Sequence, residues 1–408
     1  MDLAKKFTTL DSKVLGKEQF AASGIVGRAF LISIIVGLTY TIIFADPKFV
    51  VQSDVVSFLT GALMIRNKVG VNLYDLPTQL FYQNQIVSPF VREAVLPFKI
   101  FAPFALPFVP LTSLPLKTAY MFFAFLNFAL LGLLPHLTAM TLNKLREFRF
   151  WYLAPFIFLP SILSVILGQL SIVLAFIYFL IFKFVKDKKE ALAGVFSALL
   201  LIKPQYVIAI PFFLLLSDNR RSFLKGFLIV FFILILSTLI ISSPDALLKY
   251  PSFLLLTENE FFSGHSQRML TVSSTLYYNL PMKLSSYKGA LSLNALFYFI
   301  VYCIFIKKYK RVNFDYAFAS AVIFSLLFAV HVLEHDLAIL MVPFLILLNI
   351  AVTDKKNRKT LYILAFLLFL MPQIVLIISP AFGSIMTIFI AITLLYKKTN
   401  FGFLWKRK

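Results

Sequence analysis

One carboxylate stands out in the first polar stretch of the chain. Asp54 follows Ser53 shortly after the first long apolar run. A carboxylate at a membrane surface can act as a general base and take a proton from an attacking hydroxyl group. Ser53 or Asp54 could instead cap a helix over residues 55–63 by accepting a backbone N–H. The local pattern leaves both roles open.

A lysine and a proline interrupt an apolar stretch in the middle of the chain, in the sequence Ile202-Lys203-Pro204-Gln205. A lysine inside a membrane segment is costly and usually faces a cavity or a partner. The proline breaks the helix, which is tolerated where the backbone lines a cavity. A phosphate group would suit the ammonium, and Gln205 is a candidate ligand for a sugar or acceptor. A lysine that snorkels to the interface is the alternative.

Two further polar sites lie at the ends of apolar runs. Tyr74 could stack on a sugar ring or sit at the level of the lipid headgroups, and Asp75 could hold hydroxyl groups or open a turn before Pro77. Gln169 follows Gly168 between two apolar runs, where its amide can both donate and accept a hydrogen bond. A helix turn at this junction is the alternative.

The last candidates lie in the second half of the chain. His335 and Asp336 stand at an expected helix start, with His331 one helical turn earlier and so on the same face. We expect His335 near a phosphate and Asp336 near a sugar or acceptor, whereas a capped helix start with exposed charge is the alternative. Arg268 could bind phosphate, although a solvated loop charge is more common.

The composition of the chain indicates that membrane-embedded helices must position these residues. The 408 residues are 60% hydrophobic and 14% charged, with a mean hydropathy of +0.89. A soluble domain could not cover this much apolar material. The net charge is +21. The Lys and Arg residues of the chain cluster between apolar runs. This pattern is explained by the positive-inside rule of membrane proteins rather than by nucleic-acid binding.

Sequence motifs narrow the chemistry further. The single cysteine, Cys303, allows no intrachain disulfide, and no HExxH or His/Cys metal-ligand spacing appears. No Walker or GxGxxG phosphate loop appears either, so the sequence does not support a role for ATP. We therefore expect neither a metal nor a bound cofactor.

Long apolar runs predict an all-α polytopic membrane protein with about twelve transmembrane segments, because each crossing needs about 20 apolar residues. The clear runs cover residues 27–45, 117–139, 151–167, 169–186, 223–242, 289–306, 315–333, 337–352, 361–378 and 380–396. Residues 96–115 and 191–217 are broken by prolines. We expect the first to dip in and return outside, and the second to form a helix pair that meets near Lys203-Pro204. Two single crossings are the alternative.

This layout predicts one integral membrane domain over residues 1–408, in the cell membrane, with both termini cytoplasmic. Its parts are a cytoplasmic N-terminus at 1–26, extracytoplasmic loops with helices at 46–95 and 243–286, and a cytoplasmic tail at 397–408. The first span is expected to be uncleaved. The two loops are too long to be mere connectors, which favours a functional role for them.

Several short motifs, in this order, resemble glycosyltransferase family 87 over about residues 54–343. They are Asp54 with Gly70-Val71-Asn72-Leu73-Tyr74-Asp75, the segment Leu96-Pro97 to Pro107, Ala119 to Asn127, Gly168-Gln169, Ala193-Gly194-Val195, Leu201 to Gln205, and His335-Asp336-Leu337 to Pro343. The resemblance implies the GT-C fold, a catalytic aspartate at Asp54, and a polyprenyl-phosphate sugar as donor, with mannose as the sugar of the characterised members.

On this resemblance, a phosphate leaving group needs cations rather than a proton. Lys203, with His335 or Arg268, would hold the phosphate, while Asp54 alone as base predicts inversion at the anomeric carbon. The acceptor would be a glycolipid, a glycan or a protein. A multispan lipid or solute transporter or flippase is the alternative function, but it predicts inverted repeats and paired broken helices. The sequence has one broken helix and no detectable repeat. A non-catalytic partner in an envelope assembly is a third class.

Overall fold

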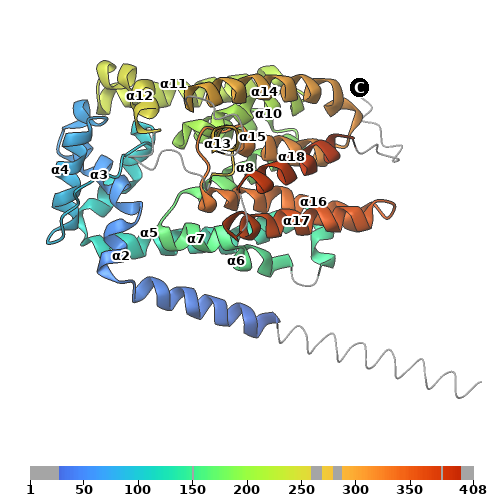
Figure 1. Ribbon diagram of the computed structural model, residues 1–408, viewed down its shortest axis with the longest axis horizontal. Helices are drawn as coiled ribbons and strands as arrows, with labels where there is room; N and C mark the ends of the chain where they lie inside the picture. The colour runs from blue at the N-terminus through green and yellow to red at the C-terminus, as the bar shows by residue number, and fades with distance from the viewer. Residues whose placement is uncertain (1–26, 149–150, 259–268, 279–286, 378–379, 397–408) are drawn as a thin grey trace, which may run out of the picture.

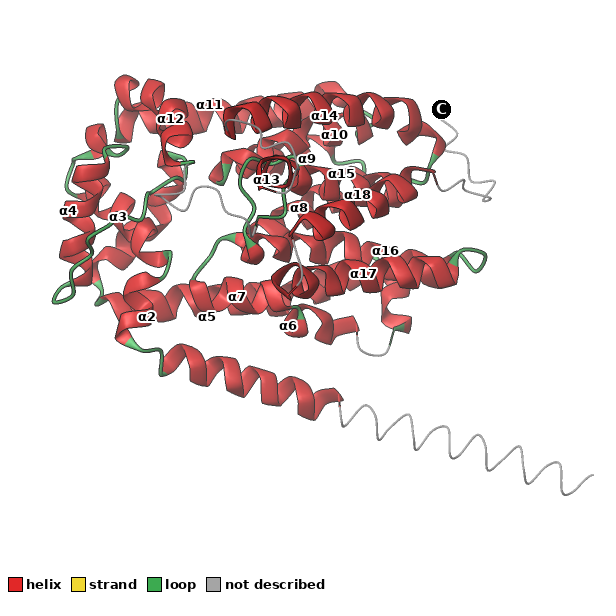
Figure 2. Cartoon of the chain, viewed as in Figure 1, coloured by secondary structure: helices red, strands yellow, loops and turns green. Residues whose placement is uncertain are grey.

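The computed structural model describes residues 27–148, 151–258, 269–278, 287–377 and 380–396. It is 83% helical and contains no strand over these ranges. Helices joined by short loops are evident throughout Figure 2. The all-α prediction is therefore confirmed. The predicted cytoplasmic ends at 1–26 and 397–408 lie outside the described residues.

Short helices from two distant parts of the chain gather at one end of the molecule, on the left in Figure 1. They are α2 (Pro47–Gln52), α3 (Val55–Arg66), α4 (Leu76–Val87), the 3-10 helices η1 (Gly70–Asn72) and η2 (Ala102–Ser113), and α12 (Pro244–Thr257). Local side-chain caps fix the starts of α2 and α12. Asp46 accepts from the Lys48 N–H at 2.7 Å, and Ser243 accepts from the Ala246 N–H at 3.0 Å.

Longer helices extend away from this end and form the body of the molecule (Figure 1). They are α5 (Leu116–Thr141), α7 (Leu159–Leu167), α8 (Ser171–Lys186), α11 (Arg220–Ile241), α14 (Tyr287–Lys308), α15 (Phe314–Leu327), α16 (Met341–Thr353), α17 (Arg358–Ile377) and α18 (Pro380–Tyr396), with a first helix at Gly27–Ile43. Shorter elements are η3 (Asn143–Glu147), η4 (Trp151–Leu153), α6 (Ala154–Ile157), α13 (Val272–Tyr278), η8 (Tyr309–Arg311) and η9 (Glu334–Leu340).

Four helices in the described part of the chain are long and apolar enough to cross a membrane: Leu116–Thr141, Arg220–Ile241, Tyr287–Arg311 and Glu334–Thr353. Their burial differs sharply. Only 17% of the apolar window is buried in each of the second and third, against 89% in the fourth. Large apolar side chains such as Phe232 and Ile240 project from α11, at 57% and 83% exposure. Apolar side chains on this scale suit contact with lipid.

The core of the molecule centres on α15 and α16. Every residue from Asp315 to Leu327 is buried, as is nearly all of α16. These helices carry long apolar runs with no polar stripe, which is the pattern of a helix surrounded by protein on all sides. The helix of 315–333 was predicted to be longer. It ends at Leu327, and residues 328–333 form a bend and an irregular segment before η9.

The segment 191–217 folds back on itself, so that it starts and ends at the same end of the molecule. It consists of α9 (Glu190–Ala198), η5 (Leu199–Ile202), η6 (Pro204–Ala209) and α10 (Ile210–Leu216). The Lys188 Nζ lies 3.9 Å from an Asp218 carboxylate oxygen, so the two ends of the segment meet. Lys203, with an extended ψ of 95°, stands at the break between its two arms. The helix-pair prediction is confirmed.

The segment 96–115 also stays at one end of the molecule. Its start is held by Gln83 of α4, which exchanges two hydrogen bonds with Leu96 at 2.6 and 2.9 Å. Helix η2 then packs against α3, and α5 begins beside α2 and α3. Both ends of the segment therefore lie where the first loop lies, as predicted for a segment that returns outside.

Basic clusters meet at the opposite end. Lys186 contacts Asp315 at 2.8 Å, which joins the ends of α8 and α15, and Arg220 donates to the Tyr309 hydroxyl at 2.8 Å. Helix α8 has 16 residues and therefore spans roughly 24 Å between Ser171 and this basic end. The clusters at 183–189, 220–225 and 307–311 thus share one side, as the positive-inside rule requires.

Candidate active site

Asp54 lies at the joint between α2 and α3. Its backbone N–H donates to the Leu167 carbonyl at 3.2 Å, while the Ser53 hydroxyl turns back to the Val50 carbonyl at 2.7 Å. Asp54 occupies the N-cap position of α3, but its side chain makes no capping hydrogen bond. The carboxylate accepts instead from the Gln169 side-chain amide. The capping alternative therefore does not describe this side chain.

Gln169 connects Asp54 to the lysine of the broken helix. Its amide nitrogen donates to Asp54, and its amide oxygen accepts from the Lys203 ammonium at 3.3 Å. The preceding Gly168 ends α7 at φ +67°, and a Cβ there would lie 2.3 Å from a Val55 methyl carbon. Only glycine combines this conformation with so close an approach. The Asn127 side-chain amide donates to the backbone carbonyl of Gln169 at 3.0 Å and so fixes this turn.

Lys203 forms a buried ion pair with Asp336. The ammonium nitrogen lies 2.6 Å from Oδ1 of Asp336, whose side chain is 0% exposed, against 12% for Lys203. The same oxygen accepts from the Ser171 hydroxyl at 2.7 Å, and Oδ2 accepts from the Leu333 N–H at 3.3 Å. These contacts compensate the lysine charge in an apolar setting. We call Asp54, Gln169, Lys203 and Asp336 the polar network.

The two histidines beside the network have different partners. The Nε2 atom of buried His335 lies 3.7 Å from Oδ2 of Asp336. The carbonyl of His331 accepts from the Gln205 amide at 3.4 Å. The expectation that both histidines share a helical face is wrong, because His331 lies in the irregular segment 328–333. Hydrogen bonding of Leu333 to the Asp336 carboxylate accompanies this break in the helix.

A second charged cluster borders the network. The Lys99 ammonium lies 3.2 Å from Glu258, and the Nδ1 atom of His331 lies 3.2 Å from the other oxygen of Glu258. Burial favours a higher pKa for Glu258, but His331 and Lys99 together outweigh it and lower this pKa. The sequence analysis missed the role of Lys99. Its position between prolines of the 96–115 segment was the only available signal.

Burial raises the pKa of Asp54 to about 6. The positive charge of Lys203 and the hydrogen bond from Gln169 oppose this rise, while the negative charge of Asp336 adds to it. A base with a pKa near neutrality can accept a proton and still be ionised at physiological pH. Arg92, also missed by the sequence analysis, interacts with Asp54 and donates to the Val51 carbonyl at 2.7 Å.

Tyr74 and Asp75 have contacts of their own in the first loop. The Asp75 carboxylate caps α4, accepting from the N–H and the hydroxyl of Thr78 at 3.0 and 2.6 Å. The Tyr74 ring packs against Tyr250 and Phe253, with centroids 4.6 and 5.2 Å away. The Asp75 contacts are those of a residue that opens a turn before Pro77, whereas Tyr74 packs in an aromatic cluster. Arg268 lies outside the described residues.

The Asp336 carboxylate is fully enclosed and bound to Lys203. Within the described ranges, no group of three or more His, Cys, Asp or Glu side chains could hold a metal ion. The charged and polar groups brought together in these ranges are the carboxylates of Asp54, Asp336 and Glu258, the ammonium groups of Lys203 and Lys99, and the imidazoles of His331 and His335.

No curated protein and no solved structure matches the chain. A family profile does match, over residues 102–330. This range is more than half of the chain, and it contains Gln169 and Lys203 of the polar network. It also agrees with the resemblance found from the sequence motifs. The chain belongs to glycosyltransferase family 87 and is a membrane glycosyltransferase.

Proposed function

We propose that the enzyme moves a hexose, mannose in the first instance, from a polyprenyl monophosphate to an acceptor on the extracytoplasmic side of the cell membrane. One observation carries the proposal. Asp54 and Lys203 are 149 positions apart in the sequence, yet both bind the Gln169 amide. The proposed base and the proposed phosphate-binding cation are therefore separated by a single side chain, at the end of the molecule opposite the basic clusters.

The reaction needs a base on the acceptor side of the sugar. The acceptor hydroxyl oxygen attacks the anomeric carbon, and its proton passes to the Asp54 carboxylate. A pKa of about 6 suits this transfer, because the carboxylate is ionised above that pH and still basic enough to hold the proton. With Asp54 as the only base, the oxygen enters on the face opposite the departing phosphate, so the configuration at the anomeric carbon inverts.

The departing phosphate needs a cation nearby to stabilise the negative charge that develops on it. The anomeric carbon–oxygen bond breaks, and the electron pair leaves with the polyprenyl phosphate. Lys203 is the proposed partner of that phosphate, assisted by His335 and by Arg268. Asp336 holds the Lys203 ammonium at 2.6 Å and so orients it before the donor arrives. Gln169 and Gln205 are the proposed ligands of the sugar hydroxyls.

The scaffold is proposed to be of the GT-C type with about twelve membrane segments. Ten helices would each cross once, namely Gly27–Ile43, α5, α7, α8, α11, α14, α15, α16 with η9, α17 and α18. The two arms of segment 191–217 would supply the remaining two segments. Several of these helices have fewer than 18 residues, which local thinning of the bilayer and snorkelling of flanking residues would accommodate.

A donor screen tests this function. The full-length protein in lipid nanodiscs is offered hexoses on polyprenyl monophosphate and, in parallel, the same hexoses on nucleotides, with a membrane lipid extract as the acceptor source. We expect a labelled glycosidic product from the lipid phosphate donor alone, with inverted anomeric configuration by NMR. Transfer from the nucleotide donors, or retention of configuration, would contradict the proposal. Movement of the lipid across the bilayer without a new glycosidic bond would favour the flippase alternative.

A further inference from the structure

A fully buried hydroxyl group stands beside the polar network without a hydrogen bond. Tyr206 is 0% exposed, and its hydroxyl has no hydrogen-bond partner among the residues that the structure describes. The Asp336 carboxylate lies close enough to act on this hydroxyl electrostatically. A buried polar group that makes no hydrogen bond lowers stability, so its presence needs a physical reason.

Tyr206 belongs to the same turn of the chain as the lysine of the network. Its backbone N–H donates to the Lys203 carbonyl at 3.0 Å, at the start of η6. The Lys203 ammonium binds Asp336 at 2.6 Å, and the Tyr206 hydroxyl lies beside the same carboxylate. One turn therefore brings two hydrogen-bond donors to Asp336, of which only the ammonium is in use.

Aromatic packing holds the ring that carries this hydroxyl. The Tyr178 ring meets the Tyr206 ring edge-on at a centroid distance of 6.4 Å, and both side chains are fully buried. The Tyr178 hydroxyl, in contrast, lies 2.9 Å from the Ser325 hydroxyl and is hydrogen-bonded to it. The two neighbouring tyrosines therefore differ in whether their hydroxyl group has a partner.

The Asp336 carboxylate has room for a further donor. Its Oδ1 atom accepts from the Lys203 ammonium at 2.6 Å and from the Ser171 hydroxyl at 2.7 Å. Its Oδ2 atom accepts from the Leu333 N–H at 3.3 Å. A carboxylate offers about four acceptor positions, two on each oxygen. Oδ2 can therefore accept a second hydrogen bond without displacing the first.

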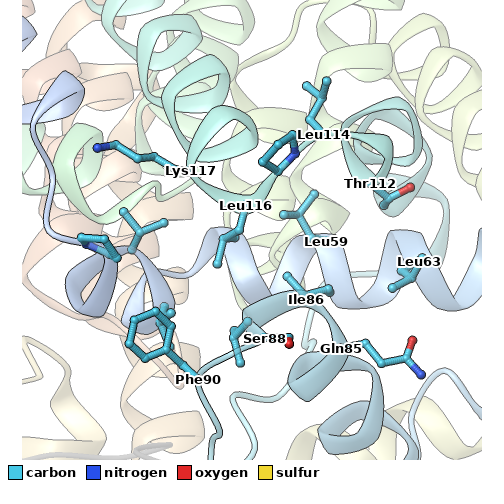
Figure 3. Close-up of a pocket in the computed structure, with 15 residues that line it drawn as sticks. Leu59, Leu63, Gln85, Ile86, Ser88, Phe90, Thr112, Leu114, Leu116 and Lys117 are labelled. Atoms are coloured by element: carbon cyan, nitrogen blue, oxygen red, sulfur yellow. The ribbon is translucent and has the colours of Figure 1, made fainter.

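The hydroxyl does not line the cavity of about 510 Å³ that α2, α3, α4 and the residues leading into α5 enclose. Figure 3 shows Leu59 of α3 and Ile86 of α4 on the wall of this cavity. Neither Tyr206 nor Asp336 belongs to that wall. A molecule bound there would not contact the hydroxyl, which leaves the neighbouring carboxylate as its partner.

Arrival of the donor changes what Asp336 requires. In the proposed reaction Lys203 turns toward the phosphate, which weakens its contact with Asp336. A buried carboxylate that loses its cation is strongly destabilised. A hydroxyl that is already buried and unused can then donate to the carboxylate, and no further polar group has to be desolvated.

We propose that Tyr206 is a positioning residue, whose hydroxyl replaces Lys203 on Asp336 when the ammonium turns to the donor phosphate. The hydroxyl is unused in the free enzyme and hydrogen-bonded in the donor-bound enzyme. This inference rests on the proposed function, because the phosphate is assigned to Lys203. It explains how a lysine held in a buried ion pair becomes available to a substrate.

Binding of a short-chain polyprenyl monophosphate tests the exchange without turnover. The full-length protein in lipid nanodiscs is titrated with this probe by calorimetry. Tyr206→Phe should bind it at least about tenfold more weakly than the wild type, because Asp336 then releases Lys203 without a replacement. The Tm without the probe should be equal or higher, because the variant removes an unsatisfied buried hydroxyl. In the transfer assay the donor KM should rise at least about tenfold, with kcat within about twofold.

Tyr178→Phe is the matched control. It removes a hydroxyl from the adjacent buried ring, but one that is already bonded to Ser325. We expect a lower Tm and an affinity for the probe within about twofold of the wild type. Wild-type affinity in Tyr206→Phe, or equal weakening in both variants, would overturn the inference. A lower Tm of Tyr206→Phe without the probe would also overturn it, because a permanent bond or a bridging water would give that result.

A double variant tests the role of the carboxylate charge. Asp336→Asn removes the charge that needs a replacement and retains an acceptor for the Ser171 hydroxyl. Adding Tyr206→Phe to Asp336→Asn should therefore change the affinity for the probe less than about twofold. A tenfold loss in this background as well would show that the hydroxyl acts on something other than Asp336.

Lys203→Met separates this inference from the proposed function. If Lys203→Met binds the probe as tightly as the wild type, the lysine is not the phosphate ligand, and both the proposed function and the inference fail. If Lys203→Met loses affinity at least about tenfold and Tyr206→Phe does not, the inference alone fails.

Discussion

At the scale of single residues, Asp54 occupies a helix N-cap position and leaves the cap unused. A carboxylate that gives up this local bond for a side-chain amide from the distant junction of α7 and α8 is placed for another purpose. Burial then raises its pKa to about 6, so that the carboxylate is ionised only at the expense of some folding stability.

The pH dependence of transfer follows from that value. Asp54 must be ionised to accept a proton, so kcat/KM should rise about tenfold per pH unit below pH 6 and level off above it. Initial rates between pH 4.5 and 8 in nanodiscs would measure the profile. A flat profile across pH 6 would show that no group with this pKa serves as the base.

The contribution of Asp54 to folding stability should fall as the pH rises, whereas its contribution to catalysis should increase. The folded pKa of about 6 lies above the ordinary value of 3.8, so the folded protein binds more protons than the unfolded chain between these values. The contribution of this group to stability is therefore present below pH 4 and lost as the pH rises through 6. Asp54→Asn should keep or raise the Tm at pH 7.5. A lower Tm at pH 7.5 would indicate a structural role for the carboxylate.

Lys203 and Asp336 should behave as a coupled pair. Lys203→Met leaves an uncompensated buried carboxylate and should lower the free energy of unfolding by about 3–5 kcal/mol. Adding Asp336→Asn removes that charge and retains an acceptor for the Ser171 hydroxyl, so the double variant should regain at least half of the loss without regaining transfer. A double variant no more stable than Lys203→Met, measured by denaturant titration, would disprove the coupling.

At the scale of elements, the re-entrant segment 191–217 decides where Lys203 lies. Its first arm, α9, approaches α11 through two glycines. A Cβ at Gly194 would lie 2.0 Å from the Phe223 carbonyl oxygen, and one at Gly226 would lie 2.0 Å from the Ala191 carbonyl oxygen. Both obstacles are backbone atoms, so a side chain at either position forces the helices apart.

Gly194→Ala should therefore displace the arm that carries Lys203. We expect a lower Tm and a loss of transfer of at least about tenfold, because small misplacements of catalytic groups are costly. Gly132→Ala is the matched control. Its added Cβ would lie 3.7 Å from the Phe156 ring, an ordinary contact, and alanine favours the helix of α5. Equal behaviour of the two variants in thermal unfolding and transfer assays would contradict this role of the glycine contact.

The same elements show what the sequence could and could not predict. The hairpin around Lys203-Pro204 was predictable, since a lysine and a proline in an apolar run have few stable placements. The end of α15 at Leu327 was not, because residues 328–333 are mostly apolar and their break accompanies hydrogen bonding to the Asp336 carboxylate, which Lys203 holds in place. Asp54 and Lys203 were predicted to share a site, whereas the bridging position of Gln169 required the fold.

At the scale of the whole molecule, charge and active site lie at opposite ends. Helix α8 starts at Ser171, which binds Asp336, and ends at Lys186, which binds Asp315. The basic clusters at 183–189, 220–225 and 307–311 lie at the Lys186 end. The sequence predicted this polarity from the spacing of its Lys and Arg clusters alone.

Cysteine accessibility tests that polarity. In a Cys303→Ser background, Gln52→Cys near Asp54 should react with a membrane-impermeant maleimide in intact cells. Lys188→Cys, at a side chain that is 72% exposed, should react only after the membrane is permeabilised. Labelling of both positions in intact cells would contradict their placement on opposite sides, and labelling of Lys188→Cys alone would show the reverse orientation.

The central claim is that Asp54 is the base of a sugar transfer. Its most direct test is the rate at which Asp54→Asn transfers a labelled hexose from polyprenyl monophosphate, compared with the wild type at equal protein concentration and at a temperature well below the Tm of both proteins. Loss of the base should lower kcat at least about 100-fold while the donor still binds. Transfer by Asp54→Asn at a rate close to that of the wild type would contradict the account.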